Sequence, residues 1–269
     1  MVAANLAADR APTLLALDFD GVVCDGLREY FLTAWKVYGE VFEPDAGAPP
    51  EGLAERFYPL RPVVETGWEM PLVLYGLRSG LADQNILTRW PELVPQLLAQ
   101  AGVEPATLGQ AVDGVRDRWI RQDLNDWLSY QRFYPSVLDR LRQAMAAGVE
   151  LIIISTKEGR FIQQLLAQGG LALASHRILG KEVKQPKYET LRQLQRAHPN
   201  ATIWFVEDRV NALQAVQQQP DLGNIALFLA DWGYNTAADR AIAAPGSGIY
   251  GLSLDQFCGP FGDWPQGRG

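Results

Sequence analysis

Four short, continuous apolar segments are the feature of this sequence that most restricts its fold. None shows the alternation of polar and apolar residues expected of a half-exposed strand, and such runs are typical of parallel strands covered on both faces. The segments alternate with stretches that have the apolar spacing of helices. This alternation predicts an α/β fold with a doubly wound, Rossmann-like parallel sheet. The predicted strands are residues 13–19, 150–156, 202–208 and 225–231, and the predicted helices are residues 135–148, 159–170, 188–197 and 210–219.

A long segment of different texture separates the first predicted strand from the other three. It is rich in Trp, Leu, Gln and Arg and contains no β-branched runs. Residues 91–102 and 108–131 have helical spacing, and the Pro- and Gly-rich residues 43–52 indicate a loop. We therefore expect two domains, an α/β core and an inserted, mostly helical domain. The core is formed by residues 1–26 and 133–269, and the inserted domain by residues 27–132.

The charge of the chain argues against two classes of partner. The formal net charge is −7 and the isoelectric point is about 5.0, so the surface as a whole repels nucleic acid and anionic membranes. No apolar run is long enough for a membrane span, and the N-terminal sequence MVAANLAADRAP lacks the apolar core of a secretory signal. We therefore expect a cytoplasmic protein in which Cys24 and Cys258 are reduced thiols. No feature of the sequence indicates the oligomeric state.

Acidic residues stand where two of the predicted strands end. Asp18 and Asp20 end the first strand, and Glu207 and Asp208 end the third. Ligand sites in open parallel sheets lie outside the carboxyl ends of the strands, so these side chains converge if the two strands are neighbours. Two carboxylates ~4 Å apart at an effective dielectric of ~20 repel by about 4 kcal/mol. Either one of them is protonated or a cation lies between them, and oxygen ligands of this charge favour Mg²⁺.

Groups that can bind an anion stand at another strand end and at the start of a helix. The second strand ends in Ser155 and Thr156, where a hydroxyl and the following backbone N–H groups can hold an anion. The segment GKEVKQPKYETL carries three lysines just before or at the start of a predicted helix. A lysine there would neutralise both a phosphate group and an attacking carboxylate. With the acidic residues, these groups indicate a site for a phosphate and a cation.

These motifs, taken in order, resemble those of the haloacid dehalogenase superfamily, in particular its phosphatase and β-phosphoglucomutase-like branch, which has a helical cap inserted after the first strand. The last lysine of the three best resembles the lysine of the third motif. The Glu-Asp pair of the fourth motif is the variant found in β-phosphoglucomutase-like members. The matching segments are DFDGVVCD (18–25), LIIISTK (151–157), QPKYETL (185–191) and WFVEDRVNALQA (204–215), and the resemblance covers residues 13–26 and roughly 133–235.

The resemblance implies roles for the two aspartates of the first motif. Asp18 would be the nucleophile that takes the phosphoryl group as an aspartyl-phosphate, which divides one difficult displacement into two. Asp20 would be the general acid that protonates the leaving oxygen and then the base that activates water. The true dehalogenases lack an acid at the position of Asp20 and use no metal. Asp20 therefore favours phosphoryl chemistry over cleavage of a carbon–halogen bond.

The resemblance also implies how the metal is bound. Asp18, Asp208 and the backbone carbonyl of Asp20 would hold Mg²⁺. Glu207 would be either a further ligand or a residue that does not contact the metal and supports one of its ligands.

The phosphoryl oxygens would be bound by Ser155, Thr156 and Lys187, with Lys184 as the alternative to Lys187. The implied activity is that of a Mg²⁺-dependent phosphatase that hydrolyses a small phosphorylated metabolite. Two alternatives share the same core residues: a phosphomutase of this superfamily, and a non-catalytic binding or regulatory protein on the same fold.

Overall fold

The chain forms two compact units in the computed structural model, which describes residues 11–265. The first, called the sheet unit here, comprises residues up to Asp25 and from Phe133 onward. The second, called the helical unit, is Gly26–Arg132. The chain passes between them through two short strands, β2 (Cys24–Asp25) and β3 (Arg132–Phe133), which form a two-stranded sheet. Residues 1–10 and 266–269, which the predicted core includes, lie outside the described part.

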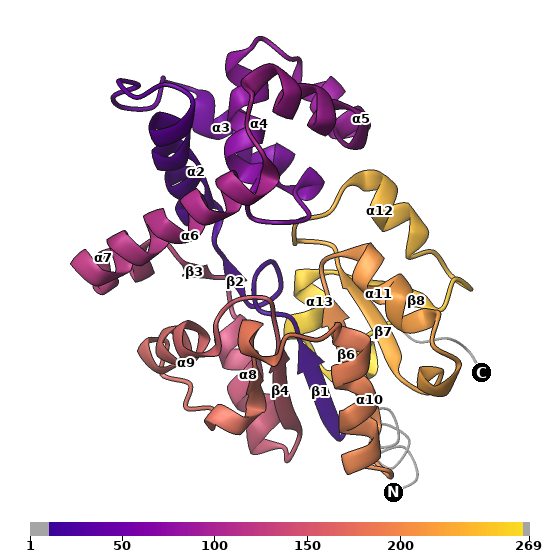
Figure 1. Cartoon of the computed structure of the whole chain (residues 1–269). Helices are drawn as coiled ribbons and strands as arrows, with labels where there is room; N and C mark the ends of the chain where they lie inside the picture. Colours follow the sequence, from indigo (N-terminus) through magenta and orange to yellow (C-terminus); the bar gives the residue numbers. More distant parts are fainter. Residues whose placement is uncertain (1–10, 266–269) are drawn as a thin grey trace, which may run out of the picture. The chain divides into compact units, whose positions relative to one another are not determined.

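The sheet unit is built on a six-stranded sheet in which every pair of neighbouring strands is parallel (Figure 1). Strand β1 lies at the centre, where Leu14 is in register with Glu150 on one side and with Ile203 on the other. The predicted α/β fold class is therefore confirmed. In spatial order the strands are β5 (Ile178–Leu179), β4 (Glu150–Ile154), β1 (Leu14–Leu17), β6 (Ile203–Glu207), β7 (Ala226–Ala230) and β8 (Ile249–Leu252).

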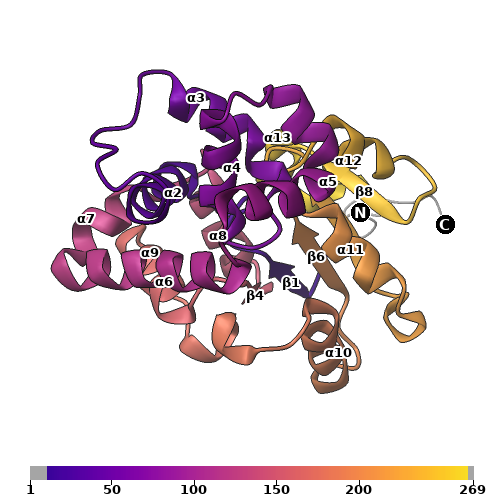
Figure 2. The same ribbon diagram turned by 45° about the horizontal axis from the view of Figure 1, so that its top comes forward.

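Both faces of the sheet are buried. Leu14 and Ala16 pack into an apolar cluster with residues of α10 (Lys187–Ala197) and α11 (Val210–Gln217), two helices that lie next to β6 in Figure 2. Leu15 and Leu17 point to the opposite face because side chains alternate along a strand, and they too are buried. On the same unit α8 (Val137–Ala146) packs against β4 and against α13 (Leu254–Cys258). Burial on both faces explains why the central strands are continuously apolar in sequence.

The two edge strands of this sheet were not predicted, and each of the four predicted strands is shorter in the structure than predicted. Strands β5 and β8 lie at the edges of the sheet, and neither contains an apolar run long enough to predict a strand. Strand β1 ends at Leu17, so that Asp18 already belongs to the loop beyond it. The remaining helical elements of this unit are α9 (Gly159–Gln168), α12 (Ala237–Ile242), η2 (Ser175–Arg177), η3 (Lys181–Val183), η4 (Pro220–Leu222) and η5 (Phe261–Asp263).

The helical unit contains no strand between residues 26 and 131, and α2 is its organising element. This helix packs against α4 and α6, and α4 packs against α5. Within residues 11–265 no helix combines the length and the apolar character needed to cross a membrane. The helices are α2 (Leu27–Val41), α3 (Leu53–Phe57), η1 (Tyr58–Val63), α4 (Glu69–Arg78), α5 (Asp83–Ala101), α6 (Pro105–Gln122) and α7 (Leu124–Ser129).

Two predicted helices of this unit differ from the structure in their ends. The helix predicted over residues 108–131 is broken at Asp123, whose backbone is extended (φ −154°) and whose side chain accepts a hydrogen bond from Asp126 N–H over 2.9 Å. That contact makes Asp123 the N-cap of α7, a position that Asp favours. The helix predicted to begin at Pro91 is the second half of α5, which is kinked at Arg89. Proline suits the first turn after such a break.

A buried carboxylate ties three helices of this unit together. Glu29 of α2 accepts hydrogen bonds from Arg116 Nε of α6 over 2.8 Å and from Trp127 Nε1 of α7 over 3.2 Å. Thr33, one turn further along α2, donates to the same carboxylate over 2.6 Å. The Glu29 side chain is only 1% exposed, so its charge depends on these partners.

Candidate active site

Three acidic side chains and a lysine meet at the carboxyl ends of β1 and β6. Asp18 follows β1, Glu207 ends β6 and Asp208 follows it, and oxygens of the three carboxylates lie within 4.8 Å of one another. Lys187 enters this cluster from the first position of α10. Its Nζ lies 2.6 Å from Glu207 Oε2 and 3.0 Å from Asp18 Oδ1. We call these four residues the acidic cluster.

Burial governs the electrostatics of the acidic cluster. It raises the pKa of Asp18 to about 7, an effect that the nearby charges of Glu207 and Asp20 strengthen and that of Lys187 opposes. Burial likewise raises the pKa of Glu207. For Lys187 burial acts to lower the pKa, but the charges of Asp18 and Glu207 outweigh it and the pKa ends above the usual range of a lysine. The cluster therefore holds a fixed positive charge beside a carboxyl group that exchanges its proton near neutrality.

Backbone contacts and two glycines hold Asp208 in place. Its Oδ2 accepts a hydrogen bond from Tyr234 N–H over 2.7 Å, and its carbonyl accepts one from Asn235 Nδ2 over 3.1 Å. A Cβ at Gly21 would lie 2.1 Å from Asp208 Oδ2, and one at Gly233 would lie 2.3 Å from Asp208 Cβ. The segment DWGYNT (231–236) after β7 thus orients the carboxylate of Asp208.

A lysine that the sequence analysis did not select lies against Asp20. Lys157 Nζ donates a hydrogen bond to Asp20 Oδ1 over 2.8 Å, and the two side chains are 8% and 14% exposed. Lys157 is the last residue of the segment LIIISTK, two positions after Ser155. Its position in the loop after β4 was the only signal available in the sequence.

The predicted phosphate-binding residues are not equivalent in the structure. Ser155 is buried, and its Oγ accepts a hydrogen bond from Lys157 N–H over 3.3 Å. Thr156 is exposed. Lys184 is also exposed and has a left-handed backbone (φ 51°). Of Lys184 and Lys187, the second is therefore the one that contacts the acidic cluster.

The residues of the acidic cluster fit a magnesium ion. Three buried carboxylates lie together with a single lysine that contacts two of them, and buried carboxylates are costly unless a cation or a proton neutralises them. All of the donors are oxygens, as Mg²⁺ prefers. Asp18 and Asp208 are the better candidates for direct contact, because both oxygens of Glu207 already accept hydrogen bonds. Glu207 Oε2 accepts from Lys187 and Oε1 from Arg209 N–H over 3.1 Å.

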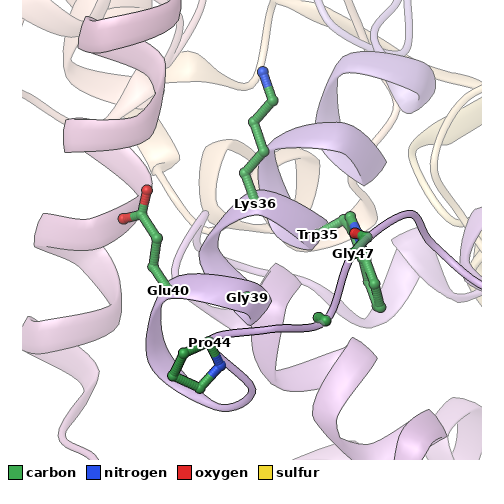
Figure 3. Close-up of a pocket in the computed structure, with 7 residues that line it drawn as sticks. Trp35, Lys36, Gly39, Glu40, Pro44 and Gly47 are labelled. Carbon is green, nitrogen blue, oxygen red and sulfur yellow. The ribbon is translucent and has the colours of Figure 1, made fainter.

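A separate hollow of about 360 Å³ lies on the helical unit near the C-terminal end of α2 (Figure 3). The two charged residues of its lining, Lys36 and Glu40, come from successive turns of α2 and both extend toward the top of Figure 3. Glu40 is paired with Arg118, and Lys36 Nζ lies 3.4 Å from the centre of the Trp119 ring. This hollow offers no group of carboxylates, so the acidic cluster of the sheet unit remains the candidate active site.

Comparison with known proteins identifies the fold. No family model matches the sequence, and no curated protein matches it either. Solved structures do match: a protein described as a predicted phosphoglycolate phosphatase from Haemophilus somnus 129pt is 18% identical, with a TM-score of 0.57, over 91% of this chain and 95% of its own.

Two further solved structures agree with the first. A predicted phosphatase from Clostridium acetobutylicum is 14% identical (TM-score 0.56; 92% of this chain and 97% of that one), and a haloacid dehalogenase-like hydrolase from Streptococcus pneumoniae is 14% identical (TM-score 0.55; 90% and 94%). The chain therefore has the fold of the haloacid dehalogenase-like hydrolases, the family that its motifs resemble.

Proposed function

We propose that this protein is a Mg²⁺-dependent phosphatase that hydrolyses a small phosphate monoester through an aspartyl-phosphate on Asp18. The contact that carries the proposal is that of Asp18 with Lys187, at 3.0 Å, inside a cluster of buried carboxylates at the ends of two neighbouring strands. A lysine in this position neutralises both the attacking carboxylate and the phosphate that it attacks. The shared fold with phosphatases supports the same conclusion.

In the first step the Asp18 carboxylate attacks phosphorus, and the bond from phosphorus to the leaving oxygen breaks. Asp20 gives its proton to that oxygen, so that an alcohol departs. Ser155 and Lys187 bind the phosphoryl oxygens, and we assign a weaker part to the exposed Thr156. In the second step water attacks the aspartyl-phosphate, Asp20 takes a proton from this water, and inorganic phosphate and free Asp18 are formed.

Asp18 and Asp208, with the backbone carbonyl of Asp20, are the groups that would hold Mg²⁺, and Glu207 supports the site by fixing Lys187. When bound, the ion would neutralise charge on the phosphoryl oxygens. We assign to the helical unit the role of the cap that selects the leaving group, because it is inserted directly after the motif that contains Asp18. We place the protein in the cytoplasm, a reducing compartment that suits its two thiols, Cys24 and Cys258, which form no disulfide.

Release of inorganic phosphate from a panel of monoesters tests this function directly. The panel would include sugar phosphates, phosphorylated short acids and polyol phosphates, each assayed with Mg²⁺ and with a chelator. We expect phosphate release from at least one class, dependence on the metal, and loss of turnover in a folded Asp18→Asn variant. If no monoester is hydrolysed, the proposal is wrong. Isomerisation of a sugar phosphate without release of phosphate would instead identify a phosphomutase.

A further inference from the structure

We infer that Lys157 is a positioning residue for proton transfer, which acts by fixing the carboxyl group of Asp20. The inference rests on the proposed function and assigns a role to Lys157, to which the motif resemblance gave none. Its basis is the 2.8 Å contact from Lys157 Nζ to Asp20 Oδ1 between two side chains that are both largely buried. A charge-assisted hydrogen bond of this length fixes the orientation of a short carboxylate.

Hydrogen bonds with two residues of η3 hold the loop that carries Lys157, so the backbone of this lysine has a fixed position. The carbonyl of Lys157 accepts a hydrogen bond from Lys181 N–H over 2.9 Å. Glu182 of the same η3 segment accepts one from Gly159 N–H over 3.1 Å. Gly180 permits this close approach, because a Cβ there would lie 2.7 Å from the Lys157 carbonyl. With the backbone fixed in this way, only the side-chain rotamer of Lys157 remains to be ordered when the lysine holds its partner.

The contact leaves one oxygen of Asp20 for chemistry. Within residues 11–265 Asp20 Oδ2 makes no hydrogen bond, whereas Oδ1 is held by Lys157. Oδ2 is then the atom that gives a proton to the leaving oxygen and later takes one from water. The two buried lysines consequently have separate tasks. Lys187 contacts the nucleophile Asp18, and Lys157 positions the acid–base group Asp20.

Leaving-group dependence distinguishes this role from a structural one. An alkyl phosphate needs a proton on its leaving oxygen, whereas 2,4-dinitrophenyl phosphate does not. We expect Lys157→Met to reduce the single-turnover rate of the first step roughly 100-fold for an alkyl phosphate, the scale of general acid catalysis, and far less for the dinitrophenyl ester. Lys157→Arg, which keeps a charged donor, should restore most of the alkyl activity. Dephosphorylation is shared by both substrates, so the comparison is made on the single-turnover rate of the first step.

A double-mutant cycle shows whether the effect passes through Asp20. If it does, Lys157→Met adds little to the loss caused by Asp20→Asn alone, because neighbours that act as a unit are not additive. Equal losses on the two substrates, additive losses in the cycle, or full activity in Lys157→Met would overturn the inference while leaving the phosphatase proposal intact. A wild-type protein that releases phosphate from neither ester would overturn the proposed function, and the role of Lys157 with it.

Discussion

Lys187 Nζ donates a hydrogen bond to Glu207 Oε2 over 2.6 Å, joining the first residue of α10 to the last residue of β6. The Glu207 side chain is 1% exposed, so this ion pair lies inside the protein and sets the position of the lysine before any ligand binds. Breaking such a buried pair on one side leaves an uncompensated charge. The lysine that we propose to bind phosphate is thus held in place by Glu207, the residue that the sequence left open as either a metal ligand or a group that supports the ligands.

The first prediction concerns the two lysines between which the sequence did not decide. Lys187→Met should lower kcat/KM for the best monoester by about 100-fold or more, the effect of removing one preorganised donor from a charged transition state. Lys184→Met is the matched control, because that exposed side chain lies in the preceding turn and should leave activity nearly unchanged. Steady-state phosphate release measures both variants, and a larger loss from Lys184→Met would reverse the assignment.

The second prediction concerns the pH dependence of stability in the metal-free protein. Folding raises the pKa of Asp18 from 3.8 to about 7, mainly through burial. A pKa raised by folding means that the native state binds the proton more tightly, so the stability from this group is complete below about pH 4 and is lost as the pH rises through about 7. Asp18→Asn has no such titration. Its melting temperature relative to wild type should therefore increase by about 5 °C or more between about pH 5 and pH 8.

Differential scanning fluorimetry in the presence of a chelator measures this difference at each pH. Folding also raises the pKa of Glu207, but this residue is present in both proteins. Its contribution to the melting temperature therefore cancels to first order in the difference between Asp18→Asn and wild type. A difference that does not change with pH would show that Asp18 does not hold its proton as tightly as its burial implies.

The third prediction concerns the close approach of Gly21 to Asp208. Gly21 has φ +85°, and an added Cβ would lie 2.1 Å from Asp208 Oδ2. Gly148 is the control, since it has nearly the same φ (+86°) but nothing within 4 Å of an added Cβ. Gly148→Ala should cost about 1–2 kcal/mol for the left-handed backbone alone. Gly21→Ala should cost about 1–3 kcal/mol more because of overpacking, and should abolish phosphate release.

Urea denaturation of the two variants gives the free energies of unfolding. The comparison isolates the steric effect, because the backbone penalty is common to both positions. Equal destabilisation, or an active Gly21→Ala enzyme, would mean that Asp208 has room to move and that its tight packing has no part in the site.

The fourth prediction compares two ion pairs that join the same two helices, α2 and α6. The Glu29 side chain is 1% exposed and pairs with Arg116, whereas Glu40 is 48% exposed and pairs with Arg118. Glu29→Gln should cost about 3 kcal/mol, because the partly buried guanidinium of Arg116, 25% exposed, loses its buried counter-charge. Glu40→Gln should cost less than about 1 kcal/mol, as is usual for exposed pairs. Chemical denaturation, followed by hydrogen exchange of the α2 amides, measures both, and similar costs would contradict the structural difference.

The fifth prediction uses an analogue of the phosphoryl group. Beryllofluoride added with Mg²⁺ should occupy the site beside Asp18 and raise the melting temperature by about 5 °C or more at saturating ligand. The shift should disappear in Asp18→Asn and when the metal is removed. A full shift in Asp18→Asn would place the analogue elsewhere and would remove the support for Asp18 as the nucleophile.

The sequence predicted the strands that are buried on both sides and missed those at the edge. Strands β1, β4, β6 and β7 each have two neighbours in the sheet and therefore form continuous apolar runs. Strand β5 has two residues, and β8 contains Gly251 and the half-buried Tyr250, so neither forms an apolar run of useful length. An edge strand depends on its one neighbour for pairing, and that information is not local.

The same distinction applies to the candidate site. Asp18, Glu207 and Asp208 could be predicted to converge, because parallel strands bring their carboxyl ends to one edge of a sheet. The contact of Lys157 with Asp20 could not, because it depends on the rotamer of a long side chain in a loop. The hydrogen bond from Tyr234 N–H to Asp208 also could not, because every residue except proline has such a donor and only the folded backbone decides where it points.

The register of β1 also determines the order in which this protein can fold during its synthesis. Leu14 pairs with Glu150 and Ile203, so β1 has no partner strand until the inserted segment and then β4 have been synthesised. The helices of Gly26–Arg132 emerge in that interval and make contacts within their own segment, which form quickly. We therefore expect the inserted segment to become compact before the sheet does, and the central strand of the sheet to be incorporated late although it precedes that segment in the sequence.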